Sequence, residues 1–89
     1  TQDLSVVVRV ETPDGEVLAA VVAGAGSLLE DARLVDDHRG TGLPDGRKSL
    51  TFALRFRAAD RTLTAEEASQ ARESAVALAA SRTGAVLRS

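Results

Sequence analysis

The sequence contains no cysteine, methionine, tryptophan or tyrosine, and its only aromatic residues are two phenylalanines. The lack of cysteine excludes disulfide bonds, thiolate metal sites and cysteine nucleophiles, and it favours a reducing compartment. No apolar run approaches the roughly 18 residues of a membrane-spanning helix, and residues 1–9 do not resemble a signal peptide. We therefore expect a cytoplasmic chain with no membrane association.

Catalytic motifs are missing from the sequence as well. One histidine without any cysteine does not make a metal site, and neither an HExxH nor a GxxxxGK[ST] pattern is present. An acylphosphatase-like reaction would need an asparagine, which the chain also lacks. We therefore expect no catalytic residue, no metal and no cofactor in this chain.

The length and composition are those of one small domain. Of the 89 residues, 44% are hydrophobic and 27% are charged, as in an ordinary globular fold. The chain begins at Thr1 and contains no methionine. We therefore expect residues 1–89 to form a single domain excised from a longer protein.

The net charge is only −2, but the charges are unevenly distributed along the chain. Residues 1–38 hold eight acidic residues, whereas residues 39–61 hold six basic residues against two acidic ones. A locally positive segment can attract a short stretch of phosphate backbone. Its arginines would equally solvate an exposed sheet face, so charge alone leaves both interpretations open.

Alternating apolar residues predict four strands. The third is the clearest, because Phe52 and Phe56 point to one side while Ser49 and Arg55 point to the other. The second strand is more polar, which is typical of an edge or bulged strand. Turn-forming residues fill the segment between the second and third strands, residues 40–48. The predicted strands are residues 4–10, 29–37, 49–57 and 85–88.

Two helices are predicted between these strands. Thr12 followed by Pro13 resembles an N-cap with proline at the first helical position, and this helix should stop near residues 24–26. Thr64 and Glu67 match a capping box, so a second helix should start there and end before a glycine cap at residue 84. The order βαββαβ predicts an α+β, ferredoxin-like fold, in which a four-stranded antiparallel sheet carries both helices on one face.

Short motifs are distributed over nearly the whole chain. They match the patterns RDLSLVV, LFDVYRG, KSL, DRTLTDEE and GAELR in order, and this combination resembles one family. That family is the C-terminal ferredoxin-fold anticodon-binding domain of the bacterial phenylalanyl-tRNA synthetase beta subunit. The resembling positions are Gln2–Val7, in which Gln2 stands in the place of the arginine, and Leu34, Asp36, Arg39–Gly40, Lys48–Leu50, Asp60–Thr64, Glu66–Glu67, Gly84–Ala85 and Leu87–Arg88.

The resemblance implies that this domain recognises the first anticodon base of phenylalanine tRNA, a guanine, and performs no chemistry itself. Asp36 would accept hydrogen bonds from guanine N1 and N2, Ser49 would supply a hydroxyl contact, and His38 would occupy the stacking position. The parent ligase would use ATP and magnesium elsewhere, chiefly in its alpha subunit. That alpha subunit would be a partner through the parent chain.

The chain departs from the family pattern where a stacking ring is expected. His38 replaces a tyrosine, and Val35 replaces a phenylalanine. An imidazole offers less ring area than a phenol and gains charge in mildly acidic solution. We therefore expect weaker binding than in a tyrosine version, and binding that rises as the pH falls. Basic residues at the loop would contact phosphates or simply keep the loop solvated: Arg39, Arg47 and Lys48.

Each residue of the expected site also has a purely structural interpretation. His38 would be a solvated polar residue, Asp36 would cap the loop through its own backbone, and Ser49 would merely begin a strand. A second class of function also stays open, namely a ferredoxin-like small-molecule regulatory or protein-interaction module. Such a module would use an apolar patch on the first helix, formed by Val17, Leu18, Val21 and Val22.

Overall fold

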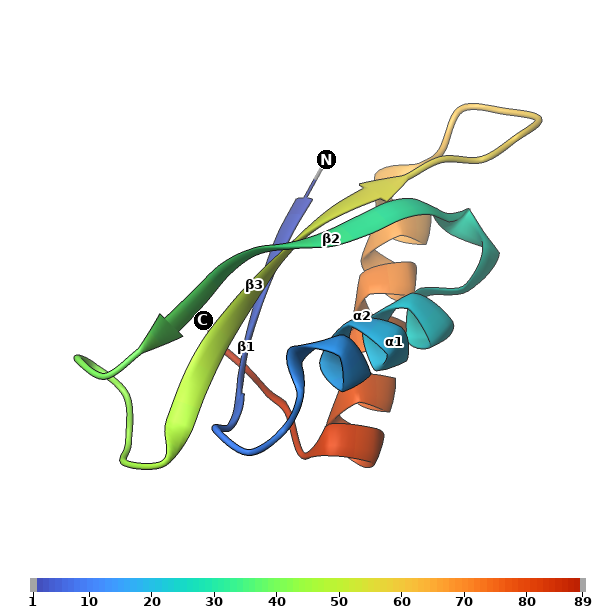
Figure 1. The fold of residues 1–89 in the computed structure, drawn as a ribbon. Coiled ribbons are helices and arrows are strands. Elements are labelled where there is room, and N and C mark those ends of the chain that lie inside the picture. Colours follow the sequence, from blue (N-terminus) through green and yellow to red (C-terminus); the bar gives the residue numbers. More distant parts are fainter. Residues whose placement is uncertain (1, 89) are drawn as a thin grey trace.

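The computed structural model describes residues 2–88, which form four strands and two α-helices (Figure 1). The two end residues of the predicted domain, Thr1 and Ser89, lie outside the described residues. All four predicted strands and both predicted helices are confirmed, with small shifts of their ends. The elements are β1 (Gln2–Arg9), α1 (Asp14–Ala25), the short 3₁₀ helix η1 (Gly26–Leu28), β2 (Leu29–Arg39), β3 (Arg47–Phe56), α2 (Ala65–Thr83) and β4 (Val86–Leu87).

The sheet has the strand order β2-β3-β1-β4, and its neighbouring strands are antiparallel. The crossover through α1 leaves a gap between β1 and β2 that β3 fills, and the crossover through α2 places β4 on the other side of β1. Both helices therefore lie on one side of the sheet (Figure 1). The predicted α+β, ferredoxin-like fold is confirmed.

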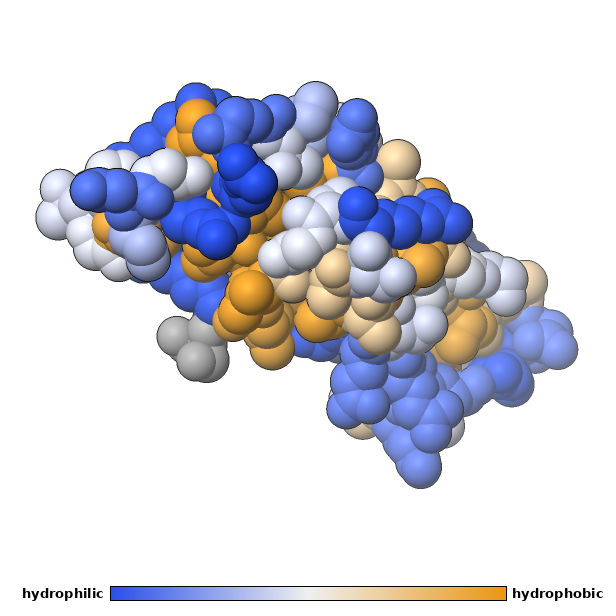
Figure 2. Space-filling view, turned by 90° about the horizontal axis from the view of Figure 1, so that it is seen from below, coloured by the Kyte–Doolittle hydropathy of each residue, from blue (hydrophilic) through white to orange (hydrophobic). Residues whose placement is uncertain are grey.

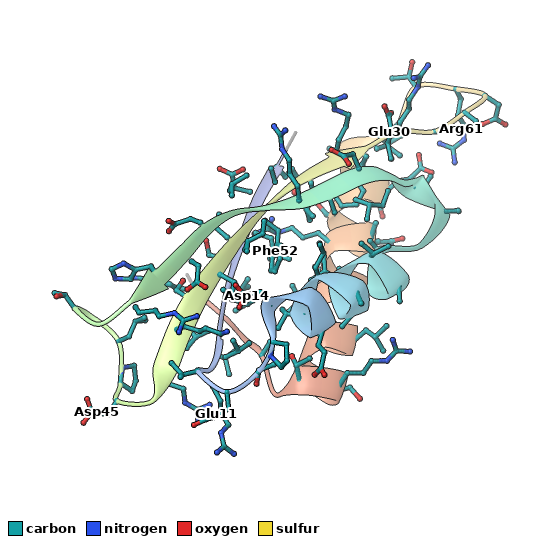
Figure 3. The ribbon with its side chains drawn as sticks, in the orientation of Figure 1. Glu11, Asp14, Glu30, Asp45, Phe52 and Arg61 are labelled. Carbon is teal, nitrogen blue, oxygen red and sulfur yellow. The ribbon has the colours of Figure 1, made fainter. Side chains whose placement is uncertain are left out.

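The hydrophobic core lies between the sheet and the two helices. Alternate residues of β1 and β3 are fully buried, and Phe52 is the largest of them (Figure 3). From the helix side, Val17 and Val21 of α1 meet a stripe of small alanines on α2. Because alanine side chains are short, α2 can approach α1 closely. The buried strand residues are Leu4, Val6, Val8, Leu50, Phe52 and Leu54.

The two helices touch at Gly24. A Cβ atom at this position would lie 2.7 Å from the backbone oxygen of Ser74, 2.8 Å from the Cα of Ala75 and 2.9 Å from the Cβ of Leu78. Ordinary carbon contacts are about 3.5–4.0 Å. Only a residue without a side chain allows this crossing.

The ends of α2 follow the sequence prediction. Thr64 accepts a hydrogen bond from the backbone N–H of Glu67, and the Glu67 carboxylate accepts one from the backbone N–H of Thr64. This reciprocal pair is the predicted capping box. At the other end Gly84 has φ 72°, a left-handed conformation that glycine adopts without strain.

The predicted start of α1 is wrong by one residue. Pro13, not Thr12, is the N-cap residue, and the Thr12 side chain caps nothing in the described chain. The reason is a turn in which the Thr12 N–H donates to the Arg9 carbonyl at 3.0 Å, so that the helix begins only at Asp14.

The apolar patch expected on the first helix is also largely absent from its surface. Val17 and Val21 are fully buried in the core, and Leu18 packs partly against it. Val22 is exposed on this helix. The helix therefore uses its apolar residues for the domain's own core, which removes the main support for an interaction module built on this face.

The molecule is elongated, with extents of 45 × 21 × 18 Å, because β2 and β3 form a twisted ribbon longer than the helix layer (Figure 1). Seen from the end that carries the β2–β3 loop, hydrophilic side chains cover much of the surface, with hydrophobic ones gathered between them (Figure 2). Among residues 2–88, neither helix is both long and apolar enough to cross a membrane.

Candidate functional site

The sheet face opposite the helices, here called the open face, collects the residues predicted to form the site. Along β3, Ser49 and Thr51 alternate with core residues and point to the open face. On β2, His38 pairs with Ser49, and Asp36 pairs with Thr51. Cross-strand partners share a face of the sheet, so Asp36 and His38 also lie on the open face.

A β-bulge in β2 brings Asp36 and His38 to this face. Leu34 pairs with a core residue of β3, so in an uninterrupted strand Asp36, two residues further along, would face the helices. The register shifts between Leu34 and Asp36, and the extra residue is Val35. Asp36 therefore lies opposite Thr51 and points away from the core.

The structure brings Asp36, His38 and Ser49 together. Residues two apart on a strand are separated by about 6.5–7 Å, and directly opposed Cβ atoms by about 4.5–5.5 Å. The three side chains thus frame an area comparable to that of a single nucleobase. Asp36 is exposed and His38 is half-buried.

The orientation of the His38 ring is set by the loop that follows β2. Its Nε2 atom lies 2.9 Å from the carbonyl oxygen of Thr41. A carbonyl only accepts hydrogen bonds, so Nε2 carries the proton and donates it. In the neutral ring Nδ1 is then an acceptor.

Ser49 lies on the predicted face but is only 2% exposed. Its neighbours across the sheet are His38 on β2 and Val7 on β1, both with larger side chains. In this structure the Ser49 hydroxyl is therefore covered rather than open to a ligand on this face.

The three basic residues expected to contact phosphates lie in different places. Lys48 points to the helix side, where its Nζ lies 2.5 Å from the Oδ1 of Asp14 and its side chain is 3% exposed. This placement argues against the expected phosphate contact, because the charge is already paired and buried. Arg47 points to the open face, where it is exposed and pairs across the sheet with Arg9 of β1.

Arg39 also lies on the helix side of the sheet, as the cross-strand partner of Lys48. Its guanidinium donates to both carboxylate oxygens of Asp37, at 3.0 and 3.1 Å. The hydrogen bond from Arg39 lowers the pKa of Asp37, and the same contact raises the pKa of Arg39. Arg39 is therefore engaged within the protein and turned away from Asp36 and His38.

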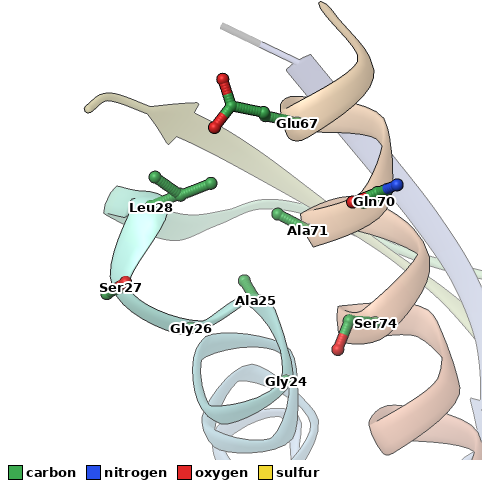
Figure 4. A pocket seen from close by; sticks show the side chains of 9 residues that line it. All are labelled: Gly24, Ala25, Gly26, Ser27, Leu28, Glu67, Gln70, Ala71 and Ser74. Atoms are coloured by element: carbon green, nitrogen blue, oxygen red, sulfur yellow. The ribbon is translucent and has the colours of Figure 1, made fainter. Parts of the chain in front are cut away.

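A shallow hollow of about 320 Å³ extends the open face beside Arg47, and Val7, Pro44 and Val86 also line it. Two other hollows lie away from the predicted site. One, of about 410 Å³, separates the end of α1 and η1 from α2 (Figure 4). The other, of about 500 Å³, lies beside Glu30 and Arg57. Neither contains a residue of the predicted site.

Sequence reasoning missed two features of this region. Asp14, which no sequence pattern singled out, is the partner of Lys48. Ser5 and Thr51 share a hydrogen bond of 2.8 Å on the open face next to Asp36. The lone lysine of a buried-strand pattern was the available signal for the first feature, but the partners are 34 positions apart in the sequence, which hides the pairing.

Between Gln2 and Arg88, no three histidine or carboxylate side chains are grouped so that they could hold a metal ion. The site is therefore built from one exposed carboxylate, one imidazole, a covered hydroxyl and an exposed guanidinium. Such a set suits hydrogen bonding and stacking with an uncharged ring next to a phosphate.

Comparison with known proteins matches this chain to one family. The family model for the ferredoxin-fold anticodon binding domain covers residues 1–88. The chain is 68% identical over 88 residues to the phenylalanine–tRNA ligase beta subunit of Leifsonia xyli, covering 99% of this chain and 10% of that protein. It is 61% identical over 89 residues to the corresponding subunit of Streptomyces avermitilis, covering 100% of this chain and 11% of that protein.

The chain therefore belongs to the ferredoxin-fold anticodon-binding domain family. It is a non-catalytic domain of the kind carried by phenylalanine–tRNA ligase beta subunits, which are parts of an aminoacyl-tRNA synthetase. It spans about a tenth of the length of these relatives.

Proposed function

We propose that this domain recognises the first anticodon base of phenylalanine tRNA, a guanine, on the open face of its sheet. The supporting observation is the exposed carboxylate of Asp36, which the bulge places beside His38. Guanine presents two donors on one edge, N1–H and the N2 amino group, and a carboxylate accepts from both. Adenine presents no such pair of donors to Asp36.

The His38 ring supplies the stacking surface in this proposal. Unpaired anticodon bases stack on side-chain rings, and each stacked base contributes about 1–3 kcal/mol. The hydrogen bond to Thr41 holds the ring at the loop, and rotation of the ring on binding would uncover Ser49.

Arg47 is the phosphate contact that the geometry supports best. It is exposed on the open face, whereas Lys48 is buried and Arg39 is bonded to Asp37. Replacing Arg47 with alanine should weaken binding of every anticodon stem-loop alike and reduce the salt slope by about one.

The wider setting follows from the relatives. We propose that the chain acts within a complete ligase, which would use ATP and magnesium outside this domain and would include an alpha subunit as partner. The relatives are each named as a beta subunit, and this name supports the proposal of a second subunit as partner. The absence of cysteine in the sequence is in keeping with a cytoplasmic location.

The test compares guanine with inosine, which lacks the 2-amino group, at the first anticodon position. Wild type should bind the guanine stem-loop about 10- to 100-fold more tightly, because a hydrogen bond to a charged group contributes about 1.5–3 kcal/mol. Asp36→Ala should bind both stem-loops equally and weakly. Asp31→Ala, which removes an exposed carboxylate near the start of β2, should keep the difference in affinity between the two stem-loops.

The decisive result is the ratio between the two stem-loops. If Asp36→Ala discriminated guanine from inosine as strongly as wild type does, Asp36 would not read the 2-amino group, and the proposal would fail.

A further inference from the structure

Four charged residues form a cluster on the helix side of the sheet, on the opposite face from His38 and Ser49. Here called the ionic cluster, it joins the first residue of α1 to the adjoining ends of β2 and β3. Two ion pairs define it, one between Lys48 and Asp14 at 2.5 Å and one between Arg39 and Asp37 at 3.0 Å. Its members are Asp14, Asp37, Arg39 and Lys48.

The two ion pairs belong to one network. The hydrogen bond from Arg39 lowers the pKa of Asp37, and the charge of Lys48 lowers it further. Lys48 and Arg39 are also direct cross-strand partners. The Asp14–Lys48 pair therefore joins α1 to the end of β3, and strand pairing joins that end of β3 to the end of β2.

The residues of the ionic cluster alternate with those of the proposed recognition site. Asp37 lies between Asp36 and His38 on β2. Lys48 directly precedes Ser49 on β3, and Ser49 is the partner of His38. Because neighbouring residues of a strand point to opposite faces, a side chain held on the helix side fixes the backbone that presents its neighbour on the open face.

Lys48 is strongly constrained by its surroundings. Its side chain is 3% exposed, and a buried ammonium group requires a partner of opposite charge. Asp14 provides that partner at the first residue of α1, where the helix dipole also favours a carboxylate. The position of the β3 end is thus tied to the position of the helix start.

We propose that the Asp14–Lys48 pair positions Asp36 and His38 for recognition of the first anticodon base, so that its removal reduces base selectivity more than it reduces stability. This inference rests on the proposed function. The pair acts through the backbone of β2 and β3 and does not touch the RNA. The two residues are therefore positioning residues.

The Asp14–Lys48 pair is part-buried, with side-chain exposures of 27% for Asp14 and 3% for Lys48, and ion pairs withdrawn from water contribute little net stability. Replacing a buried pair by apolar residues of similar volume is often neutral or stabilising, whereas removing one partner alone is strongly destabilising. The double variant Asp14→Leu/Lys48→Met can therefore remove the pair while the domain still folds. Site geometry is sensitive to displacements of about 0.5 Å, so recognition should respond where stability does not.

The experiment uses the complete ligase carrying this domain and compares wild type with Asp14→Leu/Lys48→Met. Binding of anticodon stem-loops with guanine or inosine at the first position gives the selectivity ratio. We expect the double variant to lose about tenfold in this ratio, equivalent to about 1.4 kcal/mol, the size of one misplaced hydrogen bond. Its melting temperature should stay near that of wild type.

A matched control separates positioning from general destabilisation. Val21→Ala removes part of a fully buried side chain on the core side of α1, away from the ionic cluster. This variant should lower the melting temperature and leave the selectivity ratio unchanged. If the double variant kept its selectivity, or lost no more than Val21→Ala, the positioning role would be refuted.

A second readout does not depend on RNA. Amide hydrogen exchange should accelerate in the double variant at the ends of β2 and β3 around His38 and Lys48, and not in Val21→Ala. If wild type did not discriminate guanine from inosine, the proposed function would fail. Hydrogen exchange would still decide whether the Asp14–Lys48 pair holds the ends of β2 and β3 in place. Unchanged exchange would overturn the inference.

Discussion

Replacing Gly24 with alanine should destabilise the domain although alanine is the better helix former. Gly24 lies on α1 where this helix crosses α2. The added methyl group would sit 2.7 Å from the Ser74 carbonyl oxygen and 2.8 Å from the Ala75 Cα. Both are backbone atoms of a helix, so neither can rotate away as the end of a side chain could.

The size of the effect follows from two opposing contributions. Relieving the contacts requires the helices to move apart by several tenths of an ångström, and overpacking of this kind costs about 1–3 kcal/mol. Three contacts below 3.0 Å place this site near the upper end of that range. The gain in helix propensity offsets about 1 kcal/mol. The net loss should be about 2 kcal/mol, or a melting temperature lower by roughly 8–16 °C.

Urea and thermal unfolding, followed by circular dichroism, measure this loss. Gly15→Ala is the matched control, because Gly15 lies on the same helix and a Cβ there would meet nothing within 4 Å. Gly15→Ala should be neutral or stabilising by up to about 1 kcal/mol. If Gly24→Ala were as stable as Gly15→Ala, the close crossing of α1 and α2 would not constrain the fold as argued.

Two further predictions concern the capping box and the carboxylates. Thr64→Ala should lower the free energy of unfolding by about 1 kcal/mol, whereas Thr64→Ser should keep most of the stability of wild type because serine also caps a helix. Equal urea midpoints for the two variants would contradict the cap. Hydrogen bonds from Arg39 and Arg61 lower the folded pKa of Asp37 and Glu67 below the ordinary values of 3.8 and 4.5. Their stabilisation is therefore complete above those values and lost as the pH falls through the lowered pKa. The melting temperature should drop in this range, and a flat profile from about pH 5 to 2 would disprove the linkage.

Much of the fold was predictable because its signals are local. The alternation along β3, the Thr64–Glu67 capping box and the left-handed Gly84 are each written in a few adjacent residues, and all are confirmed. The start of α1 was the local exception, because the preceding turn displaces the cap from Thr12 to Pro13.

The candidate site was predictable in its residues but not in its geometry. Family motifs pointed to Asp36, His38 and Ser49, and the structure gathers them on one face. Simple alternation from Leu34 would have turned Asp36 toward the core, and only the bulge at Val35 reverses this. The burial of Ser49 had no local signal, and the partner of the buried Lys48 lies 34 positions away in the sequence.

The sequence by itself determined the elements, their order and the family, because periodicity, caps and motifs act over a few residues of chain. Only the tertiary structure decided which side chains reach the open face and which charges are buried. The bulge in β2 depends on its register with β3, and the Lys48–Asp14 pair joins groups 34 residues apart. Such pairings form because the whole sheet and its helices bury their apolar faces together, and no single segment encodes them.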